Sequence, residues 1–189
     1  FYKHKKYLLK GKSGTGKTTL LKAILREYND YTGTVKINGI DVKIIKESSI
    51  FDNVAYVPQH PHMFNAKLRD NLTLFSEDVS EEELFETLKF VELSKWANRE
   101  SLELMLSNDT IKLSGGEAKR IALARALLMK TDILFLDEFS SGIDLETLSK
   151  IENRLLQTSK LIIYITHVDT DRIIQQFDEI IDLNEFVDL

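Results

Sequence analysis

The chain of 189 residues contains no cysteine, which excludes a disulfide framework, a thiolate metal site and a cysteine nucleophile. This absence fits a reducing compartment. No apolar run approaches the roughly 20 residues that a membrane-spanning helix needs, and the basic start at 1–6 is not followed by the apolar region of a signal peptide. The formal net charge of −5 gives no sign of a general nucleic-acid binder. The 43% of apolar residues suffice for one substantial globular core.

The most informative stretch that is present is Gly11 to Thr19, GKSGTGKTT. Its order of Gly, four free positions, Gly, Lys and a hydroxyl residue is that of a nucleotide phosphate-binding loop. The glycines let successive N–H groups point at an anion. Lys17 adds a positive charge for the phosphates, and the Thr18 hydroxyl can reach Mg²⁺. A short strand predicted at 7–9 and a helix predicted at 18–27 place the loop at a helix N-terminus, whose dipole attracts phosphate. This context favours a phosphate-binding loop over a plain glycine-rich turn.

Hydrophobic periodicity predicts strands that alternate with helices along the rest of the chain. Asn38-Gly39 predicts a hairpin turn, and Ser80 predicts a capped helix start. The predicted strands are 54–57, 133–136, 161–165 and 180–183, and the predicted helices lie within 68–97, 117–130 and 145–158. This alternation predicts an α/β fold with a mostly parallel sheet and helices on both faces. The segment at about 65–115 is rich in helix and poor in strand, so we expect it to be a helical subdomain inserted in the sheet.

Two acids, Asp137 and Glu138, follow the apolar run at 133–136. In a parallel sheet, ligands bind beyond the carboxyl ends of the strands. Asp137 is therefore expected to hold Mg²⁺, directly or through water, and Glu138 to accept a proton from the water that attacks the γ-phosphate. A strand that simply ends in two acids is the alternative, and the phosphate loop in the same chain favours the metal and catalytic roles.

A second glycine-rich stretch, LSGGE at 113–117, opens the predicted helix at 117–130. Ser-Gly-Gly at a helix start offers N–H groups and a hydroxyl to an anion, and a plain helix cap explains the same residues equally well. One nucleotide does not need two such sites in one chain, which suggests that one of them serves a nucleotide held by another subunit. His167 also follows a buried strand. A lone histidine is usually structural, but its place at the carboxyl end of a strand suggests a contact with phosphate, and the Gln59 amide could contact metal or water.

Taken in order, these motifs resemble those of the ATP-binding cassette (ABC) family, and the match covers nearly the whole chain. GKSGTGKTT resembles the Walker A loop, LSGGE the family signature, and ILFLDE at 133–138 the Walker B strand with its catalytic glutamate. Gln59 falls at the Q-loop, SGID at 141–144 at the D-loop, and His167 at the H-loop. The stretch at 57–72 is similar to the exporter branch of the family.

The resemblance implies a P-loop NTPase-type fold and an ATPase that drives transport. Two cassettes would pair head to tail, with ATP and Mg²⁺ between the Walker A loop of one and the signature of the other. Glu138 would polarise the attacking water, His167 and Lys17 would contact the γ-phosphate, and Gln59 would couple the site to a transmembrane partner. The implied ATP-binding residues are Gly11, Lys12, Ser13, Gly14, Thr15, Gly16, Lys17, Thr18, Thr19, Ser114, Gly115, Gly116 and Asp144, and the implied metal-binding residues are Thr18, Gln59 and Asp137.

We therefore expect one ABC ATPase domain over 1–189, with its core at about 1–64 and 116–189 and the helical subdomain at about 65–115. Its expected partners are a second cassette and a transmembrane domain at the cytoplasmic face of the cell membrane, with no specific nucleic acid. The chain begins too close to Walker A to contain the family's adenine-stacking aromatic residue. We therefore expect an N-terminal truncation and an incomplete small antiparallel sheet.

Two other classes of protein share these motifs. One is a soluble ABC-type ATPase that acts on nucleic acid or ribosomes, and the exporter-like stretch at 57–72 and the acidic net charge argue against it. The other is a cassette that binds ATP without hydrolysing it, which the intact Glu138 and His167 disfavour.

Overall fold

The computed structural model describes residues 1–106, 113–166 and 173–186. Its strands are β1 (Lys6–Lys10), β2 (Lys36–Ile37), β3 (Ile40–Asp41), β4 (Val54–Val57), β5 (Ala66–Lys67), β6 (Met105–Leu106), β7 (Ile133–Asp137), β8 (Leu161–Ile165) and β9 (Glu179–Asp182). Its α-helices are α1 (Lys17–Ile24), α2 (Glu47–Phe51), α3 (Leu68–Thr73), α4 (Glu81–Phe90), α5 (Arg99–Leu102), α6 (Gly115–Leu128) and α7 (Leu145–Leu156). Short 3₁₀ helices lie at Val42–Ile44, Ser94–Trp96, Ile174–Gln176 and Leu183–Phe186.

The chain divides into two compact units, which we call the sheet unit and the helical unit. The sheet unit comprises 1–56, 131–137 and 159–189, and the helical unit comprises 57–130 and 138–158. The predicted subdomain at about 65–115 lies within the helical unit, and its bounds stay a prediction. None of the helices in the described ranges combines the length and the apolar character that crossing a bilayer requires.

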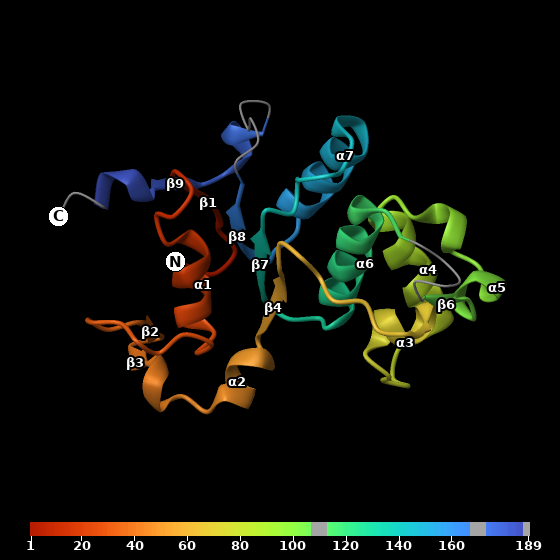
Figure 1. Cartoon of the computed structure of the whole chain (residues 1–189), viewed down its shortest axis with the longest axis horizontal. Helices are drawn as coiled ribbons and strands as arrows, with labels where there is room; N and C mark the ends of the chain where they lie inside the picture. Colours follow the sequence, from red (N-terminus) through yellow and green to blue (C-terminus); the bar gives the residue numbers. More distant parts are fainter. Residues whose placement is uncertain (107–112, 167–172, 187–189) are drawn as a thin grey trace. The chain divides into compact units, whose positions relative to one another are not determined.

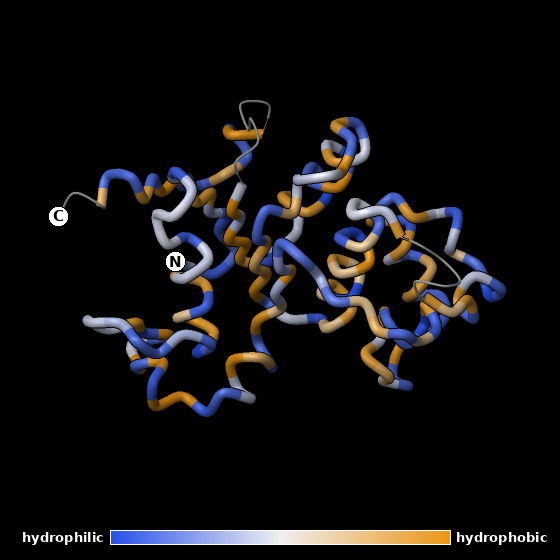
Figure 2. The backbone as a smooth tube through the Cα atoms, in the orientation of Figure 1, coloured by the Kyte–Doolittle hydropathy of each residue, from blue (hydrophilic) through white to orange (hydrophobic). Residues whose placement is uncertain are grey.

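A five-stranded sheet with the order β4-β7-β8-β1-β9 forms the sheet unit (Figure 1). β7, β8, β1 and β9 pair in parallel, which confirms the predicted α/β class. The central strands are continuous apolar runs because both of their faces are covered, and Figure 2 shows this apolar character along β7 and β8. The register aligns Leu9 with Ile165 and Ile165 with Asp137. The loop after β1 and the end of β7 therefore leave the sheet at one edge, where the parallel fold places a ligand.

Helix α1 is held against this sheet by an apolar core. Its residues Leu21 and Ile24 pack with Tyr7 of β1, Phe135 of β7 and Ile163 of β8. Each of these side chains is at most 8% exposed. At about 25 cal/mol for each Å² of apolar surface removed from water, such burial is the main source of the unit's stability. The core anchors the body of α1, so its N-terminal end is held at the carboxyl edge of the strands.

The helical unit is built around α6, which contacts α3 and α4. Its buried residues include Ile121, Ala122 and Leu123, three successive positions that point in different directions around the helix. A helix that is apolar on several sides is an internal one. In Figure 1 α6 accordingly lies beside α3 and α4. The Ser80 capping box at the start of α4 is also present, as predicted.

The helical stretch predicted at 68–97 contains separate helices, because Leu74 and Phe75 adopt left-handed backbone conformations with φ of 52° and 66°. This conformation ends α3 before the capped start of α4. The hairpin at Asn38-Gly39 is confirmed by the pairing of β2 with β3. The segment at 99–106 forms α5 and β6, and β6 pairs with β5.

Candidate active site

The phosphate-binding loop lies in the sheet unit between β1 and α1. Gly14 and Gly16 both have φ of +85°, a left-handed conformation that residues with a Cβ resist. Gly16 occupies the N-cap position of α1 and makes no side-chain cap, so the first-turn N–H groups of α1 stay directed along the axis toward an anion site. The Lys17 ammonium lies inside the loop and donates to the carbonyl oxygens of Gly11 and Lys12, both at 2.8 Å. Ser13 and Thr19 are exposed.

Thr18 and Asp137 meet in this unit, as predicted for a metal site. The Thr18 hydroxyl donates to Oδ2 of Asp137 at 2.9 Å, and Asp137 is 2% exposed at the end of β7. The two residues are 119 positions apart in the chain and are joined by the register of the parallel sheet. A hydroxyl and a carboxylate are hard oxygen ligands of the kind that Mg²⁺ takes in proteins. The residues present therefore fit a magnesium ion.

Tyr56 of β4 is a part of this arrangement that the sequence analysis missed. Its hydroxyl donates to the same Oδ2 of Asp137 at 3.1 Å. Burial raises the pKa of the Tyr56 hydroxyl well above its ordinary value of 10.0, and the charge of Asp137 adds to this effect. The hydroxyl is therefore protonated at neutral pH and remains a donor. Its one sequence signal is a tyrosine in an otherwise apolar strand, VAYV, because a buried tyrosine hydroxyl needs a polar partner.

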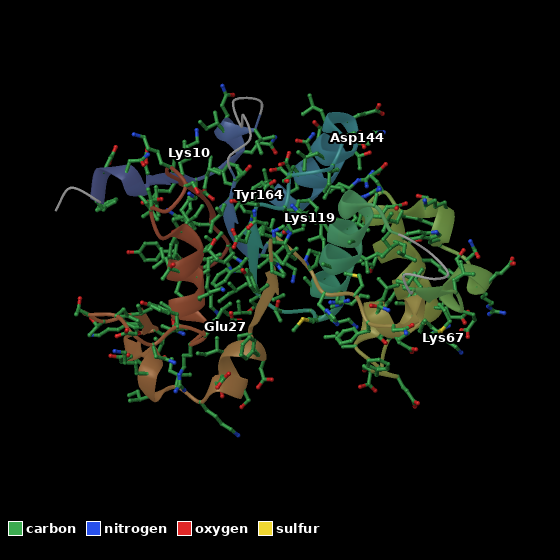
Figure 3. All side chains as sticks on the ribbon, viewed as in Figure 1. Lys10, Glu27, Lys67, Lys119, Asp144 and Tyr164 are labelled. Atoms are coloured by element: carbon green, nitrogen blue, oxygen red, sulfur yellow. The ribbon has the colours of Figure 1, made fainter. Side chains whose placement is uncertain are left out.

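Glu138, the predicted base, lies in the helical unit and is held at both ends. Its Oε2 accepts a hydrogen bond from Nε2 of Gln59 at 2.6 Å. Its backbone carbonyl accepts one from the Lys119 ammonium at 2.5 Å. Glu138 has φ of 48°, a left-handed conformation that is uncommon for a residue with a Cβ. Lys119, labelled on α6 in Figure 3, is 6% exposed and was not singled out from the sequence as a site residue.

The LSGGE stretch forms a complete capping box at the start of α6. Ser114 Oγ accepts from the Glu117 N–H at 3.1 Å, and Glu117 Oε2 accepts from the Ser114 N–H at 2.9 Å. The Ser114 hydroxyl hydrogen can still be donated elsewhere, because a hydroxyl both accepts and donates. Gly116 is packed tightly, since a Cβ there would lie 2.5 Å from the carbonyl oxygen of Gly142. The local geometry is thus that of a helix cap, and the anion-binding role stays a prediction.

Asp144 in the D-loop segment caps a helix as well. Its carboxylate accepts from the Thr147 N–H at 2.9 Å at the start of α7 (Figure 3). That backbone hydrogen bond lowers the pKa of Asp144 below its ordinary value of 3.8. The predicted site residue His167 lies outside the described residues.

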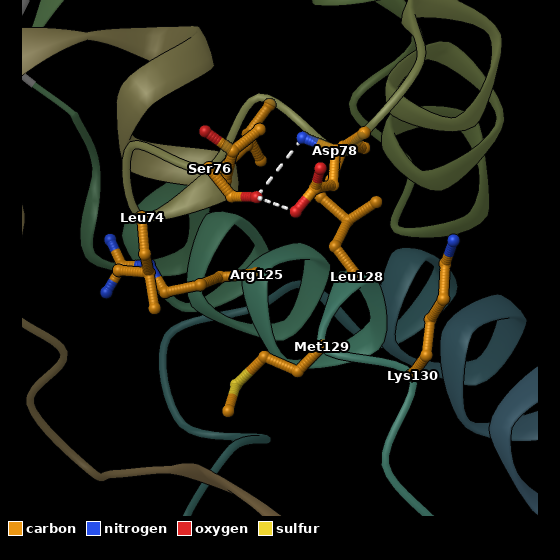
Figure 4. A pocket seen from close by; sticks show the side chains of 10 residues that line it. Leu74, Ser76, Asp78, Arg125, Leu128, Met129 and Lys130 are labelled. Atoms are coloured by element: carbon orange, nitrogen blue, oxygen red, sulfur yellow. Dashed lines mark hydrogen bonds between the residues drawn. The ribbon is translucent and has the colours of Figure 1, made fainter. Parts of the chain in front are cut away.

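The helical unit also contains an apolar pocket of about 250 Å³ (Figure 4). The Ser76 hydroxyl there donates to Asp78 at 3.4 Å and accepts from the Asp78 N–H at 3.2 Å. The Arg125 guanidinium donates to the carbonyl of Asn71 at 2.8 Å, and Lys130 pairs with Glu83 at 2.6 Å. Because these polar groups already have protein partners, the pocket shows no arrangement for recognising a charged ligand.

The fold and these motifs can be compared with known proteins. The model of the ABC transporter family matches residues 1–141. The chain belongs to the ABC transporter family. Family membership is therefore confirmed. The relatives and the solved structure described next confirm the resemblance to exporters and do not favour the soluble alternative.

Relatives of this ABC chain include transport proteins. It is 38% identical over 169 residues to the lactococcin-A transport/processing ATP-binding protein of Lactococcus lactis subsp. lactis. This alignment covers 87% of this chain and 23% of that protein. It is 36% identical over 159 residues to a glutathione/L-cysteine transport system ATP-binding/permease protein of Escherichia coli, covering 83% and 28%. The chain thus spans about a quarter of the length of these curated relatives.

A solved structure of similar fold is a bacterial Atm1-family ABC exporter with ATP bound. Its TM-score is 0.84 at 25% sequence identity, and the match covers 95% of this chain and 32% of that chain. The P-loop NTPase-type fold predicted from the sequence is therefore confirmed.

Proposed function

We propose that this chain binds and hydrolyses ATP and thereby powers export through a transmembrane partner. The observation that carries the proposal is the placement of the phosphate loop beside the buried contact between Thr18 and Asp137, which is 2.9 Å long. Family membership, the transport proteins among the relatives and the similar structure of an ABC exporter support the transport role. Their cargoes differ, so the cargo is not part of the proposal.

ATP binding rests on the loop at 11–19. The N–H groups at the start of α1 receive the phosphates, and the Lys17 ammonium exchanges loop carbonyls for phosphate oxygens. Thr18 and Asp137 would hold Mg²⁺, with Gln59 as a further ligand. When bound, Mg²⁺ neutralises charge on the phosphates and on the leaving group.

Hydrolysis needs a base that takes a proton from the attacking water, and we assign this role to Glu138. The hydrogen bond from Gln59 orients its carboxylate, and Lys119 holds its backbone. A residue held at both ends keeps its reactive oxygen in one position, which is how positioned bases accelerate proton transfer. His167 is assigned a contact with the γ-phosphate, and Gln59 the link to the membrane partner.

A second cassette would complete the site. Ser114 caps α6, and Gly115 and Gly116 lie in its first turn, where backbone N–H groups have no backbone acceptor within the helix. We propose that these groups, with the Ser114 hydroxyl and Asp144, approach an ATP bound by the partner cassette. The chain would then work at the cytoplasmic face of a membrane.

An exposed apolar surface on the helical unit is a candidate contact for the transmembrane partner. Leu74, Phe75 and Met129 are 43%, 60% and 41% exposed, and Leu74 and Met129 line the pocket in Figure 4. Exposed apolar side chains that form one continuous patch mark protein interaction sites.

The testing experiment measures Mg-ATP hydrolysis against protein concentration for the parent chain and for Glu138→Gln. Turnover that rises more than linearly with concentration supports a composite site of two cassettes. We expect Glu138→Gln to keep ATP binding and to lose about 100-fold or more in turnover, because general-base catalysis contributes that much. Glu146→Gln, which changes an acid that is 81% exposed, is the matched control. Parent-like turnover in Glu138→Gln would remove Glu138 from the base role.

A further inference from the structure

We propose that Tyr56 is a positioning residue for the metal site, because it holds the Asp137 carboxylate in the orientation that a nucleotide-bound Mg²⁺ needs. This inference rests on the proposed function, and it adds a residue that the motifs do not contain. Tyr56, Thr18 and Asp137 all belong to the sheet unit.

The hydrogen bonds define the arrangement. Tyr56 on β4 and Thr18 at the start of α1 donate to the same oxygen, Oδ2 of Asp137, at 3.1 Å and 2.9 Å. β4 lies next to β7 in the sheet, so the tyrosine and the aspartate are carried on neighbouring strands (Figure 1). Asp137 is 2% exposed, and its surroundings are thus set by protein groups.

The two donors have different tasks. The terminal torsion of an aspartate is broad, so a carboxylate turns unless its oxygens are held. Donors on Oδ2 decide where the second oxygen, Oδ1, lies. The Thr18 hydroxyl would serve the metal as well as Asp137, whereas the Tyr56 hydroxyl comes from a strand and, within the described residues, donates to the carboxylate. Tyr56 therefore helps to keep Asp137 in place while the Thr18 oxygen also serves Mg²⁺ through a lone pair.

The size of the expected effect follows from other metal sites. Groups that orient a metal ligand without touching the metal change metal affinity by about 10- to 100-fold when they are removed. Thr18 remains as a second donor after Tyr56→Phe, so we expect a loss at the lower end, about 10-fold. The phenylalanine ring keeps the packing of the tyrosine, and the substitution thus isolates the hydroxyl.

The experiment measures ATP affinity of the purified chain by calorimetry in Mg²⁺ and again in EDTA. This readout requires no turnover. Tyr56→Phe should bind ATP in EDTA as the parent chain does and bind it about 10-fold more weakly in Mg²⁺. Tyr7→Phe is the matched control, because Tyr7 is 1% exposed and its hydroxyl accepts from the Tyr2 N–H at 2.9 Å, away from Asp137. It should leave both affinities unchanged.

Other outcomes would overturn the inference. The inference fails if Tyr56→Phe leaves the ratio of ATP affinity in Mg²⁺ to ATP affinity in EDTA unchanged. An equal loss of affinity in both conditions is such a result, and it would mean that Tyr56 has a structural role only. Asp137→Asn separates this failure from that of the proposed function. If Asp137→Asn loses the Mg²⁺ effect and Tyr56→Phe does not, only the inference fails. If Asp137→Asn keeps the Mg²⁺ effect of the parent chain, or if the parent chain itself shows no Mg²⁺ effect on ATP affinity, the metal role of Asp137 fails, and the inference with it.

Discussion

Replacing Gly116 by alanine tests how tightly the LSGGE segment is packed within the helical unit. A Cβ at Gly116 would lie 2.5 Å from the carbonyl oxygen of Gly142 and 3.3 Å from its carbonyl carbon. Both atoms belong to the backbone, so neither can swing aside as the end of a side chain does. Gly142 itself has φ of +81°, which restricts how its peptide group can turn.

The neighbouring Gly115 offers a matched control. A Cβ at Gly115 would meet nothing within 4 Å. Both glycines lie in the first turn of α6, so the gain in helix propensity on replacement by alanine, at most about 1 kcal/mol, is similar for both. The difference between Gly116→Ala and Gly115→Ala therefore reports the clash alone. Overpacking of this kind costs about 1–3 kcal/mol, and we expect Gly116→Ala to be less stable than Gly115→Ala by that amount.

The assay is urea unfolding of the parent chain and both variants, followed by a spectroscopic probe. A change in midpoint at constant slope reports a change in the free energy of unfolding. We expect Gly115→Ala to unfold at or above the parent midpoint and Gly116→Ala below it. Equal midpoints for the two alanine variants would refute the close approach of α6 to the backbone at Gly142.

Two further predictions concern helix caps. The lowered pKa of Asp144 means that its carboxylate binds a proton more weakly in the folded state than in the unfolded state. The ionised carboxylate therefore contributes to stability above pH 3.8, and this contribution is lost as the pH falls through the lower pKa of the folded state. Asp144→Asn keeps a cap and removes the titration, so its urea midpoint should vary less between about pH 5 and 2; an equal acid loss in both proteins would contradict this. Ser80→Ala removes the capping box of α4 and should lower the free energy of unfolding by about 1 kcal/mol. Ser80→Thr keeps a capping hydroxyl and should retain most of that stability. Calorimetric unfolding of the parent chain and the two variants tests this prediction.

Local patterns determined much of this protein. The glycine spacing at 11–19 specifies a loop of N–H groups, and the structure has its glycines at positive φ as the pattern requires. The apolar run at 133–136 and the capping box at Ser80 also act over a few residues, so that neighbours in the chain decide them. The predicted turn at Asn38-Gly39 is confirmed because the backbone preference of these two residues is also local.

The tertiary structure decided what depends on distant partners. Tyr56 meets Asp137 across 81 positions because β4 is the neighbour of β7, and no local pattern states the order of strands in a sheet. Lys119 reaches the carbonyl of Glu138 across 19 positions, since α6 and the residue after β7 are brought together by packing. Gly116 is likewise required by the backbone at Gly142, which only the folded chain places against it. Short-range sequence thus specifies the chemical groups of the site, and long-range packing specifies which groups hold them in position.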